Sequence, residues 1–481
     1  MQYKVFSPKN IFIDCKSNIQ EALKKMNKNG YGLVFVKKQN KVVGVISDGD
    51  VRRIILRKKK IDFIKTNIEK IMRKNFFYLK DYDFTKAKIK KYYKILPILN
   101  NKKEAKGFIK NNLDFIPIYQ PLLGGNEKKY INDAIDTSWI SSSGKYVELF
   151  EKKFKSYSGL KYVTTTTSGT SALHLACLAI GVRPGDEVIL PAYTFAAPIN
   201  VVIQLKAKPV FVDVNYKTCC IDEKLIEKNI TKKTKAIIIV HLYGNTCRIE
   251  KIAQLAKKHK IKLIEDCAEA LGTTYKKKHV GGFGDASTFS FYGNKTISTG
   301  EGGMVSLKKE YDFKKAILYK NHGMEKKKNY FHVLPGLNFR MTNIQAAIGC
   351  AQIENIKTII SKKKYISDFY AKFFYNSKNF KTVEDQKDTF NTHWLYFLVV
   401  NSKIDKEKLL IFLKKKGVDA RRAFYSVSEM PIYSEYLNKN KYPVSDKLSK
   451  KGFCLPSYPA LDYNQLNRIV GLVKYFIKKY K

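Results

Sequence analysis

One stretch of the chain sets a single lysine between a strand and a glycine-rich turn. It reads Ser287-Thr-Phe-Ser-Phe-Tyr-Gly-Asn-Lys295-Thr-Ile-Ser-Thr-Gly-Glu-Gly-Gly303. Residues 288–292 favour a short β-strand, and the glycines after Lys295 let other groups come close to the backbone. A lysine in a partly desolvated pocket can act as a nucleophile and form a Schiff base with a carbonyl group. The alternative is a surface lysine in a turn, and this stretch alone does not decide between the two.

The length and charge of the chain restrict the class of protein. Its 481 residues exceed what one compact core needs, so we expect two or three domains. The formal net charge of +48 would suit nucleic-acid binding. However, the basic residues are mostly lysines spread over the whole length, without an arginine-rich run or a nucleic-acid-binding motif, so that class is disfavoured. The charge can still attract anionic substrates such as sugar nucleotides.

The eight cysteines form no C-x-x-C pair and no spacing typical of a zinc site or a disulfide framework. The first ten residues lack the apolar core of a signal peptide. No run approaches the ~18 apolar residues of a membrane span. We therefore expect a cytoplasmic protein without a metal site.

Residues 1–113 are predicted to form a separate small α/β module. A capped helix is expected to begin at Ser17, and strands are expected at 32–36 and 42–46. The second strand leads into Ser47-Asp-Gly-Asp50 at the start of another helix. Backbone N–H groups at a helix N-terminus can hold phosphate, and a carboxylate can accept hydrogen bonds from ribose hydroxyls.

This pattern resembles a CBS domain, in which the residues matching Ser47 and Asp50 contact the phosphate and ribose of an adenine nucleotide. CBS motifs work in pairs, and residues 74–112 resemble a shorter, degenerate second repeat. This repeat has Lys110 where Ser or Thr is usual and Leu113 where Asp is usual. At most one nucleotide site is therefore expected. The alternative is a module that keeps its fold for dimer contacts and has lost its ligand.

From Pro117 onward, strand-like runs alternate with helical ones. The expected strands are 187–190, 208–214, 236–242 and 261–264, and a helix is expected at 249–259. This alternation predicts an α/β domain with a mostly parallel sheet. Ligands bind beyond the C-terminal ends of such strands, so the polar residues there are the candidates for a site.

Three strand ends carry such residues. Thr167-Ser168-Gly169-Thr170 precedes a helix, where it could hold a phosphate or act as a plain N-cap. Asp266 follows a buried strand, where it could pair with a protonated ring nitrogen or cap a helix. The run from Tyr193 to Phe195 offers an aromatic face that could stack on a flat ring or pack in the core. Together with Lys295, these groups match the needs of pyridoxal 5′-phosphate (PLP).

Residues 117–481 resemble the DegT/DnrJ/EryC1/StrS family of sugar-nucleotide aminotransferases. The resemblance implies fold type I of the PLP-dependent transferases, which is aspartate aminotransferase-like. It implies that Lys295 forms the Schiff base and that Asp266 pairs with the pyridine nitrogen. The other implied contacts are Gly169, Thr170 and Ser290 with the phosphate, Phe195 with the ring, Glu269 near the 3′-oxygen, and Asn338 with the phosphate of the neighbouring subunit. A homodimer with a shared active site is therefore implied.

Within the family, the stretch around Lys295 is most similar to GDP-perosamine synthase-like 4-aminotransferases. The loop Trp139-Ile-Ser141-Ser142 matches that group's loop near the substrate. The implied reaction transfers the amino group of L-glutamate to a nucleotide-linked 4-keto-6-deoxy sugar, for surface polysaccharide or glycan biosynthesis. Some relatives carry His in place of this lysine and act as sugar 3-dehydratases, so Lys295 favours aminotransferase chemistry.

The resemblance also implies a large PLP-binding domain at 117–360 and a smaller C-terminal α/β domain at 361–481. The alternative function is a nucleotide-sensing regulatory protein, with a PLP-binding domain of little or no turnover.

Overall fold

The computed structural model describes residues 5–6, 11–57, 62–81, 95–110, 115–325, 327–328, 330–401, 403–437 and 441–480. It divides the chain into two compact units, Met1–Phe115 and Ile116–Lys481. Leu113 and the two residues before it, which are predicted to lie at the end of the second CBS repeat, are outside the described residues. Within the described ranges, no helix is long and apolar enough to cross a membrane.

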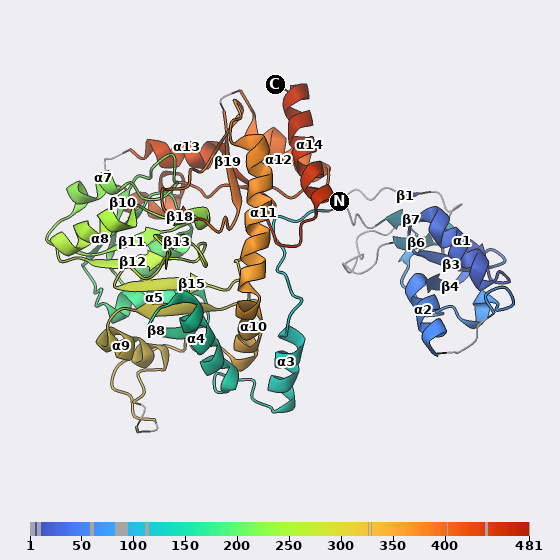
Figure 1. Cartoon of the computed structure of the whole chain (residues 1–481), viewed down its shortest axis with the longest axis horizontal. Helices are drawn as coiled ribbons and strands as arrows, with labels where there is room; N and C mark the ends of the chain where they lie inside the picture. The colour runs from blue at the N-terminus through green and yellow to red at the C-terminus, as the bar shows by residue number, and fades with distance from the viewer. Residues whose placement is uncertain are drawn as a thin grey trace. The chain divides into compact units, whose positions relative to one another are not determined.

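The first unit contains two small sheets, with the strand orders β2-β3-β4 and β1-β7-β6-β5 (Figure 1). Its elements are β1 (Val5–Phe6), β2 (Phe12–Asp14), α1 (Ile19–Asn29), β3 (Leu33–Lys38), β4 (Lys41–Ser47), α2 (Asp48–Arg57), β5 (Leu79–Lys80), β6 (Ile95–Leu99) and β7 (Ala105–Lys110). The apolar face of α1, with Ile19 and Met26, packs on Val34 and Ile46 of the first sheet. Helix α1 and this sheet therefore share one core.

Helix α1 begins one residue later than predicted, because its N-cap is Asn18 rather than Ser17. The Asn18 side chain accepts a hydrogen bond from the Glu21 N–H, and the Glu21 carboxylate accepts one from the Asn18 N–H. Both Asn18–Glu21 and Ser17–Gln20 have the three-residue spacing of a capping box, and the structure forms the first of these pairs.

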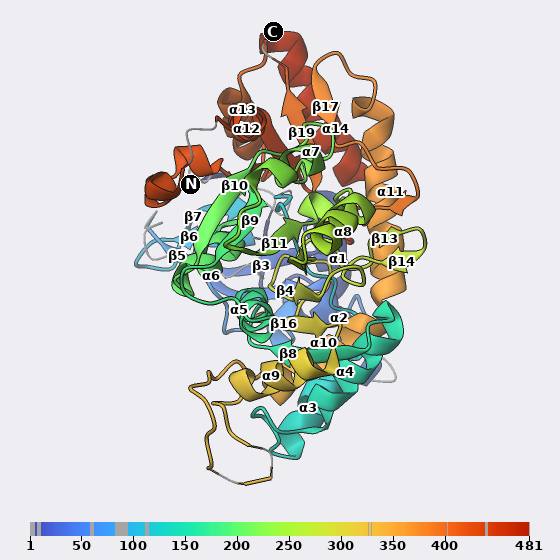
Figure 2. The same ribbon diagram turned by 90° about the vertical axis from the view of Figure 1, so that its left-hand side faces the viewer.

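The second unit is built around a sheet with the strand order β10-β9-β11-β12-β15-β16-β8 (Figures 1 and 2). The strands from β10 to β15 in this order are parallel, and β16 is antiparallel to both of its neighbours. The strands are β8 (Tyr162–Thr166), β9 (Glu187–Pro191), β10 (Lys208–Val212), β11 (Thr234–Val240), β12 (Lys262–Asp266), β15 (Ala286–Ser290) and β16 (Gly303–Leu307). The predicted α/β fold with a mostly parallel sheet is confirmed.

Helices cover both faces of this sheet. They are α3 (Glu127–Asp136), α4 (Lys145–Ser158), α5 (Gly169–Ala179), α6 (Ala196–Gln204), α7 (Glu223–Ile226), α8 (Ile249–Lys258), α9 (Glu310–Lys320) and α10 (Asn343–Glu354). Along β11, Ile237 and Ile239 share a core with α8, whereas Ala236 and Ile238 share one with α5 and α6. Because both faces are buried, the strand reads as a continuous apolar run, which made it predictable.

Strand β11 ends at Val240, two residues before the predicted end. Leu242 and Tyr243 are buried in the same core as α8, so the apolar pattern continues although the strand has stopped. The chain turns here through a single 3₁₀ turn in which Tyr243 has a φ of 56° and Gly244 a φ of 91°. Strand β10 likewise ends before residue 214, at Val212.

A smaller antiparallel sheet, β17-β19-β21-β20, forms the second part of this unit. The elements of this second part are α11 (Ile356–Phe374), β17 (Phe380–Thr382), β19 (Tyr396–Val400), α12 (Lys406–Lys415), β20 (Arg421–Arg422), α13 (Pro443–Lys451), β21 (Gly452–Leu455) and α14 (Tyr463–Tyr480). A separate three-stranded sheet contains β13 (Thr274–Tyr275), β14 (Lys278–His279) and β18 (Thr389–Phe390). Helix α11 passes through residue 360 and extends from α10 toward the small sheet (Figure 2). The boundary at residues 360 and 361 therefore stays a prediction.

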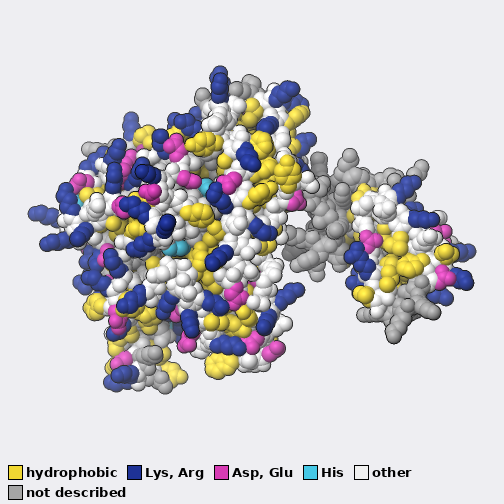
Figure 3. Space-filling view, in the orientation of Figure 1, with side chains coloured by type: hydrophobic (Ala, Val, Ile, Leu, Met, Phe, Trp, Pro, Cys, Tyr) yellow, Lys and Arg dark blue, Asp and Glu magenta, His cyan; other side chains and the backbone are white. Residues whose placement is uncertain are grey.

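Basic side chains are dispersed on the face of the molecule that Figure 3 presents. Lys and Arg lie among acidic and apolar side chains there and do not gather into one patch. This distribution matches the even spread of lysine along the sequence.

Candidate active site

The amine of Lys295 lies beside two carboxyl groups at the end of strand β12. Lys295 Nζ is 3.5 Å from Glu269 Oε1, and the two side chains are only 14% and 4% exposed. Asp266 is the last residue of β12, and Lys295 follows the neighbouring strand β15. The structure thus brings these three predicted residues together and buries the lysine, which the surface-turn alternative would have exposed.

Asp266 does not cap a helix, because residues 267–273 form turns. Its Oδ1 accepts a hydrogen bond of 2.9 Å from the Ala268 N–H. Burial raises the pKa of Asp266, and this hydrogen bond and the charge of Lys295 offset the rise only in part. A cationic ring nitrogen placed here would stabilise the charged carboxylate.

Glu269 is held by a backbone group from a distant turn. Its Oε2 accepts a 2.9 Å hydrogen bond from the Tyr243 N–H. Burial raises the pKa of Glu269 to about 7, against the opposing effects of Lys295 and this hydrogen bond. Glu269 can therefore take up or release a proton near neutral pH, next to the Lys295 amine.

A candidate phosphate cradle is formed where α5 begins. Ser168 is the N-cap, and its side chain accepts from the Ser171 N–H, so the plain capping role is right for this residue. The backbone N–H groups of Gly169 and Thr170 come next, and the first N–H groups of a helix have no partner within it. A Cβ atom on Gly169 would lie 2.7 Å from Ser290 Cβ, so glycine is needed for this close approach.

Phe195 lies at the N-terminus of α6 with 58% of its surface exposed. Its ring centroid is 5.9 Å from that of Phe424. Its neighbour Tyr193 is fully buried, so the core-packing alternative holds for Tyr193 and not for Phe195. The face of Phe195 is thus accessible to a flat ring.

Two buried polar atoms beside these residues have no hydrogen-bond partner within the part of the chain that the structure describes. They are Thr194 Oγ1, next to Phe195, and Asn294 Oδ1, next to Lys295. Buried polar groups are normally paired, so a ligand with polar groups suits this place. With the glycine cradle and the carboxylates, these residues fit PLP.

For three other predicted residues, Asn338, Trp139 and Ser141, the described part of the chain shows no hydrogen bond or ion pair with Lys295. Asn338 is exposed, and its Oδ1 accepts from Arg340 Nε at 2.9 Å. The carbonyls of Trp139 and Ser141 each accept a 2.6 Å hydrogen bond from Asn343, which anchors their loop to α10. The roles of Asn338, Trp139 and Ser141 stay predictions.

Three aromatic residues at this site were not assigned a role from the sequence. The Tyr119 hydroxyl donates to the Lys295 carbonyl. The Trp394 ring centroid is 4.2 Å from Lys295 Nζ. The Tyr243 ring stacks on that of Trp394, with centroids 6.4 Å apart and planes 10° apart. They come from distant parts of the chain, and no spacing in the sequence indicates that they meet.

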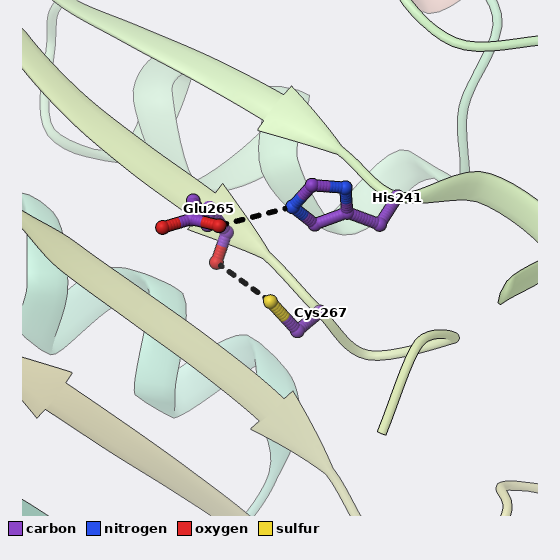
Figure 4. A group of neighbouring side chains, drawn as sticks. All are labelled: His241, Glu265 and Cys267. Carbon is purple, nitrogen blue, oxygen red and sulfur yellow. Dashed lines mark hydrogen bonds and ion pairs between the residues drawn. The ribbon is translucent and has the colours of Figure 1, made fainter. Parts of the chain in front are cut away.

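A buried group behind the site, His241, Glu265 and Cys267, contains residue types that can bind a metal (Figure 4). Glu265 Oε1 accepts from the N–H groups of Phe283 and Gly284, at 2.7 and 2.6 Å. Its Oε2 accepts from the Gly281 N–H at 2.6 Å and lies 3.1 Å from His241 Nε2.

His241 Nδ1 in turn accepts from the Cys247 N–H at 3.3 Å. Burial alone would raise the pKa of Glu265, but His241 and the backbone N–H groups outweigh burial and lower that pKa below its usual value. Both oxygens of the carboxylate and both ring nitrogens are engaged. The group therefore serves as a hydrogen-bond network that fixes the end of β12, where Asp266 lies.

In the first unit, Ser47 and Asp50 contact each other at the start of α2. The Ser47 Oγ and N–H both donate to Asp50 Oδ2, and Arg53 and Arg73 form ion pairs with the same carboxylate. Burial would raise the pKa of Asp50, but the hydrogen bonds from Ser47 and Arg53 outweigh it and lower that pKa. The carboxylate is thus already occupied by residues of the chain.

Comparison with known proteins matches each unit to a family. The profile of the CBS domain matches residues 4–57. The profile of the DegT/DnrJ/EryC1/StrS aminotransferase family matches residues 121–474. The GDP-perosamine synthase of Escherichia coli O157:H7 is 44% identical over 365 residues, covering 76% of this chain and 99% of the relative. The GDP-perosamine synthase of Vibrio cholerae is 40% identical over 361 residues, covering 75% and 98%.

Solved structures show the same fold. Helicobacter pylori PseC, an aminotransferase involved in the biosynthesis of pseudoaminic acid, matches with a TM-score of 0.72 and 27% identity, over 76% of this chain and 100% of PseC. Spr1654 of Streptococcus pneumoniae, described as a sugar aminotransferase and solved in its PLP form, matches with a TM-score of 0.72 and 26% identity, over 76% and 100%. The predicted fold type I and the predicted CBS domain are confirmed. The chain belongs to the DegT/DnrJ/EryC1/StrS aminotransferase family.

Proposed function

We propose that this protein is a PLP-dependent aminotransferase that converts a nucleotide-linked 4-keto-6-deoxy sugar into the 4-amino sugar, with L-glutamate as the donor. The observation that carries the proposal is the buried Lys295 amine, 3.5 Å from Glu269 and close enough for its charge to act on Asp266. The relatives that are 44% and 40% identical are named GDP-perosamine synthase, which favours GDP as the nucleotide and polysaccharide biosynthesis as the context.

When bound, PLP supplies an aldehyde for the amino group and a conjugated ring that delocalises negative charge. Asp266 would hold the ring nitrogen in its protonated form. Phe195 would stack on the ring, and Gly169, Thr170 and Ser290 would hold the phosphate. The amine of Lys295 would take the proton from the reacting carbon and return it, as general base and then general acid. Glu269 Oε1 lies 3.5 Å from Lys295 Nζ, so the carboxyl group and the amine can interact directly.

We also propose that the active enzyme is a homodimer. Asn338 is exposed, and its side chain accepts a hydrogen bond from Arg340 Nε, which suits a residue that completes the site of a second copy. Mixing two inactive variants, Lys295→Ala and Asn338→Ala, tests this. Mixed dimers with one intact site would regain up to about a quarter of the activity, given random assortment of shared sites. A mixture that stays inactive would contradict the shared site.

We also propose that the CBS domain binds a nucleotide. Ser47 and Asp50 stay our candidates for contacts with an adenine nucleotide. Because Asp50 already pairs with Arg53 and Arg73, a nucleotide must take over some of these hydrogen bonds. Separate calorimetric titrations of the protein with AMP, ATP and S-adenosylmethionine test whether the CBS domain binds any of them. Absence of binding to all three would favour a domain retained for packing or assembly.

An assay of amino transfer decides between the proposed aminotransferase and the alternative, a nucleotide-sensing regulatory protein with little or no turnover. Purified protein, PLP and L-glutamate are incubated with GDP-, UDP- and dTDP-linked 4-keto-6-deoxy sugars, and the release of 2-oxoglutarate and the mass of the sugar nucleotide are followed. We expect amino transfer with the GDP-linked sugar and no turnover by Lys295→Ala. Absence of transfer to all three sugars would contradict the proposed function.

A further inference from the structure

Trp394 contacts the amine of Lys295 and holds the backbone beside it. Its ring centroid is 4.2 Å from Lys295 Nζ, a distance typical of a cation–π interaction. Its indole Nε1–H donates a 2.6 Å hydrogen bond to the carbonyl of Asn294, the residue before the lysine. One side chain thus contacts the amine of the lysine through its ring, and the peptide group that precedes the lysine through its indole N–H.

Buried groups hold Trp394 in this place. Trp394 is 2% exposed, and its ring stacks on that of Tyr243. Its carbonyl accepts a 3.0 Å hydrogen bond from Lys363 Nζ, and Lys363 donates a second one, also of 3.0 Å, to the Ser457 carbonyl. Lys363 is 1% exposed. Among the described residues, no carboxylate forms an ion pair with Lys363. Burial of the lysine is costly, and its two hydrogen bonds to backbone carbonyls offset part of that cost.

The same lysine reaches a second support of the site. Lys363 Nζ lies 5.5 Å from the ring centroid of Tyr119, whose hydroxyl donates to the Lys295 carbonyl. Trp394 and Tyr119 therefore hold two successive backbone carbonyls, those of Asn294 and Lys295. Both supports meet at Lys363, in the core of the molecule.

We infer that Trp394 is a positioning residue for Lys295, and that its indole face is where the amine rests whenever the amine is not bonded to the cofactor. This inference rests on the proposed function, in which the lysine must leave the cofactor and act as a base in each half of the reaction. A free lysine side chain has several rotatable bonds and would otherwise sample many positions. The aromatic face and the Glu269 carboxylate, which lies 3.5 Å from the amine, restrict the positions that the amine can take.

The first test needs no cofactor and no substrate. The chain has two tryptophans, so Trp139→Phe leaves Trp394 as the only one. In this background, Lys295→Met keeps the apolar stem of the side chain and removes the ammonium group. We expect a change in the emission of Trp394 in the cofactor-free protein at least twofold larger than with Lys314→Met, an exposed lysine on α9. Equal changes with the two substitutions would overturn the inference.

The second test separates positioning from folding. Trp394→Leu removes the ring and the indole N–H, whereas Trp394→Phe keeps an aromatic face. A contact of this kind corresponds to roughly a tenfold effect on rate. We expect Trp394→Leu to lower kcat about tenfold with little change in KM for the sugar nucleotide, and Trp394→Phe to restore most of the loss. Tyr365→Leu, at an exposed position of α11, serves as the control.

A wild-type kcat in Trp394→Leu would overturn the inference. If Trp394→Leu does not fold, the emission experiment decides, because it leaves Trp394 in place. If the wild-type protein shows no amino transfer, the proposed function fails, and the emission experiment still decides whether the indole holds the amine.

Discussion

At the scale of single residues, Glu269 is a buried carboxyl group whose protonation is linked to folding. Burial raises its pKa from 4.5 to about 7. Between these two values the unfolded chain releases the proton while the folded chain keeps it. The contribution of Glu269 to the free energy of unfolding therefore falls as the pH rises from about 4.5 to about 7, and levels off above that.

This linkage predicts the effect of Glu269→Gln, which imitates the protonated form. The fall in the free energy of unfolding between pH 5 and pH 8 should shrink by on the order of 3 kcal/mol, since one pKa unit corresponds to about 1.4 kcal/mol. Urea unfolding of the cofactor-free wild type and of Glu269→Gln, at pH 5 and at pH 8, measures this difference in the free energy of unfolding. Glu148→Gln, at an exposed position, is the control. An unchanged pH dependence in Glu269→Gln would show that Glu269 is ionised throughout.

Gly169 gives a second prediction at this scale. In Gly169→Ala the new Cβ would lie 2.7 Å from Ser290 Cβ, which forces the start of α5 away from the end of β15. We expect the affinity for PLP to fall by about tenfold or more, because the phosphate contacts that we propose depend on that spacing. Titration of the cofactor-free protein, followed by visible absorption, measures the Kd. Gly471→Ala, on α14 with open space around it, should leave the Kd unchanged.

At the scale of elements, the turn after β11 and the segment before β19 form two walls of the site in close contact. A Cβ on Gly244 would lie 2.8 Å from the backbone nitrogen of His393 and 2.9 Å from the backbone nitrogen of Trp394. Gly244 also has a φ of 91°, which disfavours any side chain. We expect Gly244→Ala to destabilise the protein by about 2 to 5 kcal/mol, and to lower kcat by displacing Trp394.

Thermal unfolding and kcat of the same preparation check this prediction. Gly471→Ala again serves as the control. Wild-type stability in Gly244→Ala would mean that the two walls can separate at little cost.

The elements also show what the sequence could predict. Strand β11 was predictable because its two buried faces make a continuous apolar run, but its end was not, because Leu242 and Tyr243 are buried beyond it. The placement of Lys295 and Asp266 at one edge of the sheet was predictable, because polar residues at the ends of parallel strands meet there.

Trp394 was not predictable as a partner of Lys295. Its contact arises from side-chain packing between segments 99 residues apart, which leaves no periodic pattern. The capping of α1 by Asn18 instead of Ser17 shows the usual error of one residue at a helix end.

At the scale of the whole molecule, the chain divides into two compact units, and each unit contains the match to a different family. The first unit ends at Phe115, and the E. coli GDP-perosamine synthase aligns over 99% of its length with only 76% of this chain. Ile116 belongs to the second unit, where it is buried and pairs with Val418. We therefore expect residues 116–481 to fold without the first unit.

The prediction is that this shortened chain keeps kcat for amino transfer within about threefold of the full chain, since each unit has its own core. Steady-state kinetics and thermal unfolding of both proteins test it. A shortened chain that folds but has lost its activity would show that the CBS domain takes part in catalysis or assembly.

The central claim is that one lysine, in a chain with 90 lysines and arginines, bonds to PLP. The most direct test is to incubate the purified protein with PLP, reduce it with borohydride, digest it and locate the added mass by mass spectrometry. We predict a single modified residue, Lys295, and no modification at any position in Lys295→Ala. A protein that takes up no PLP, or one modified at other lysines while Lys295 stays free, would contradict the claim.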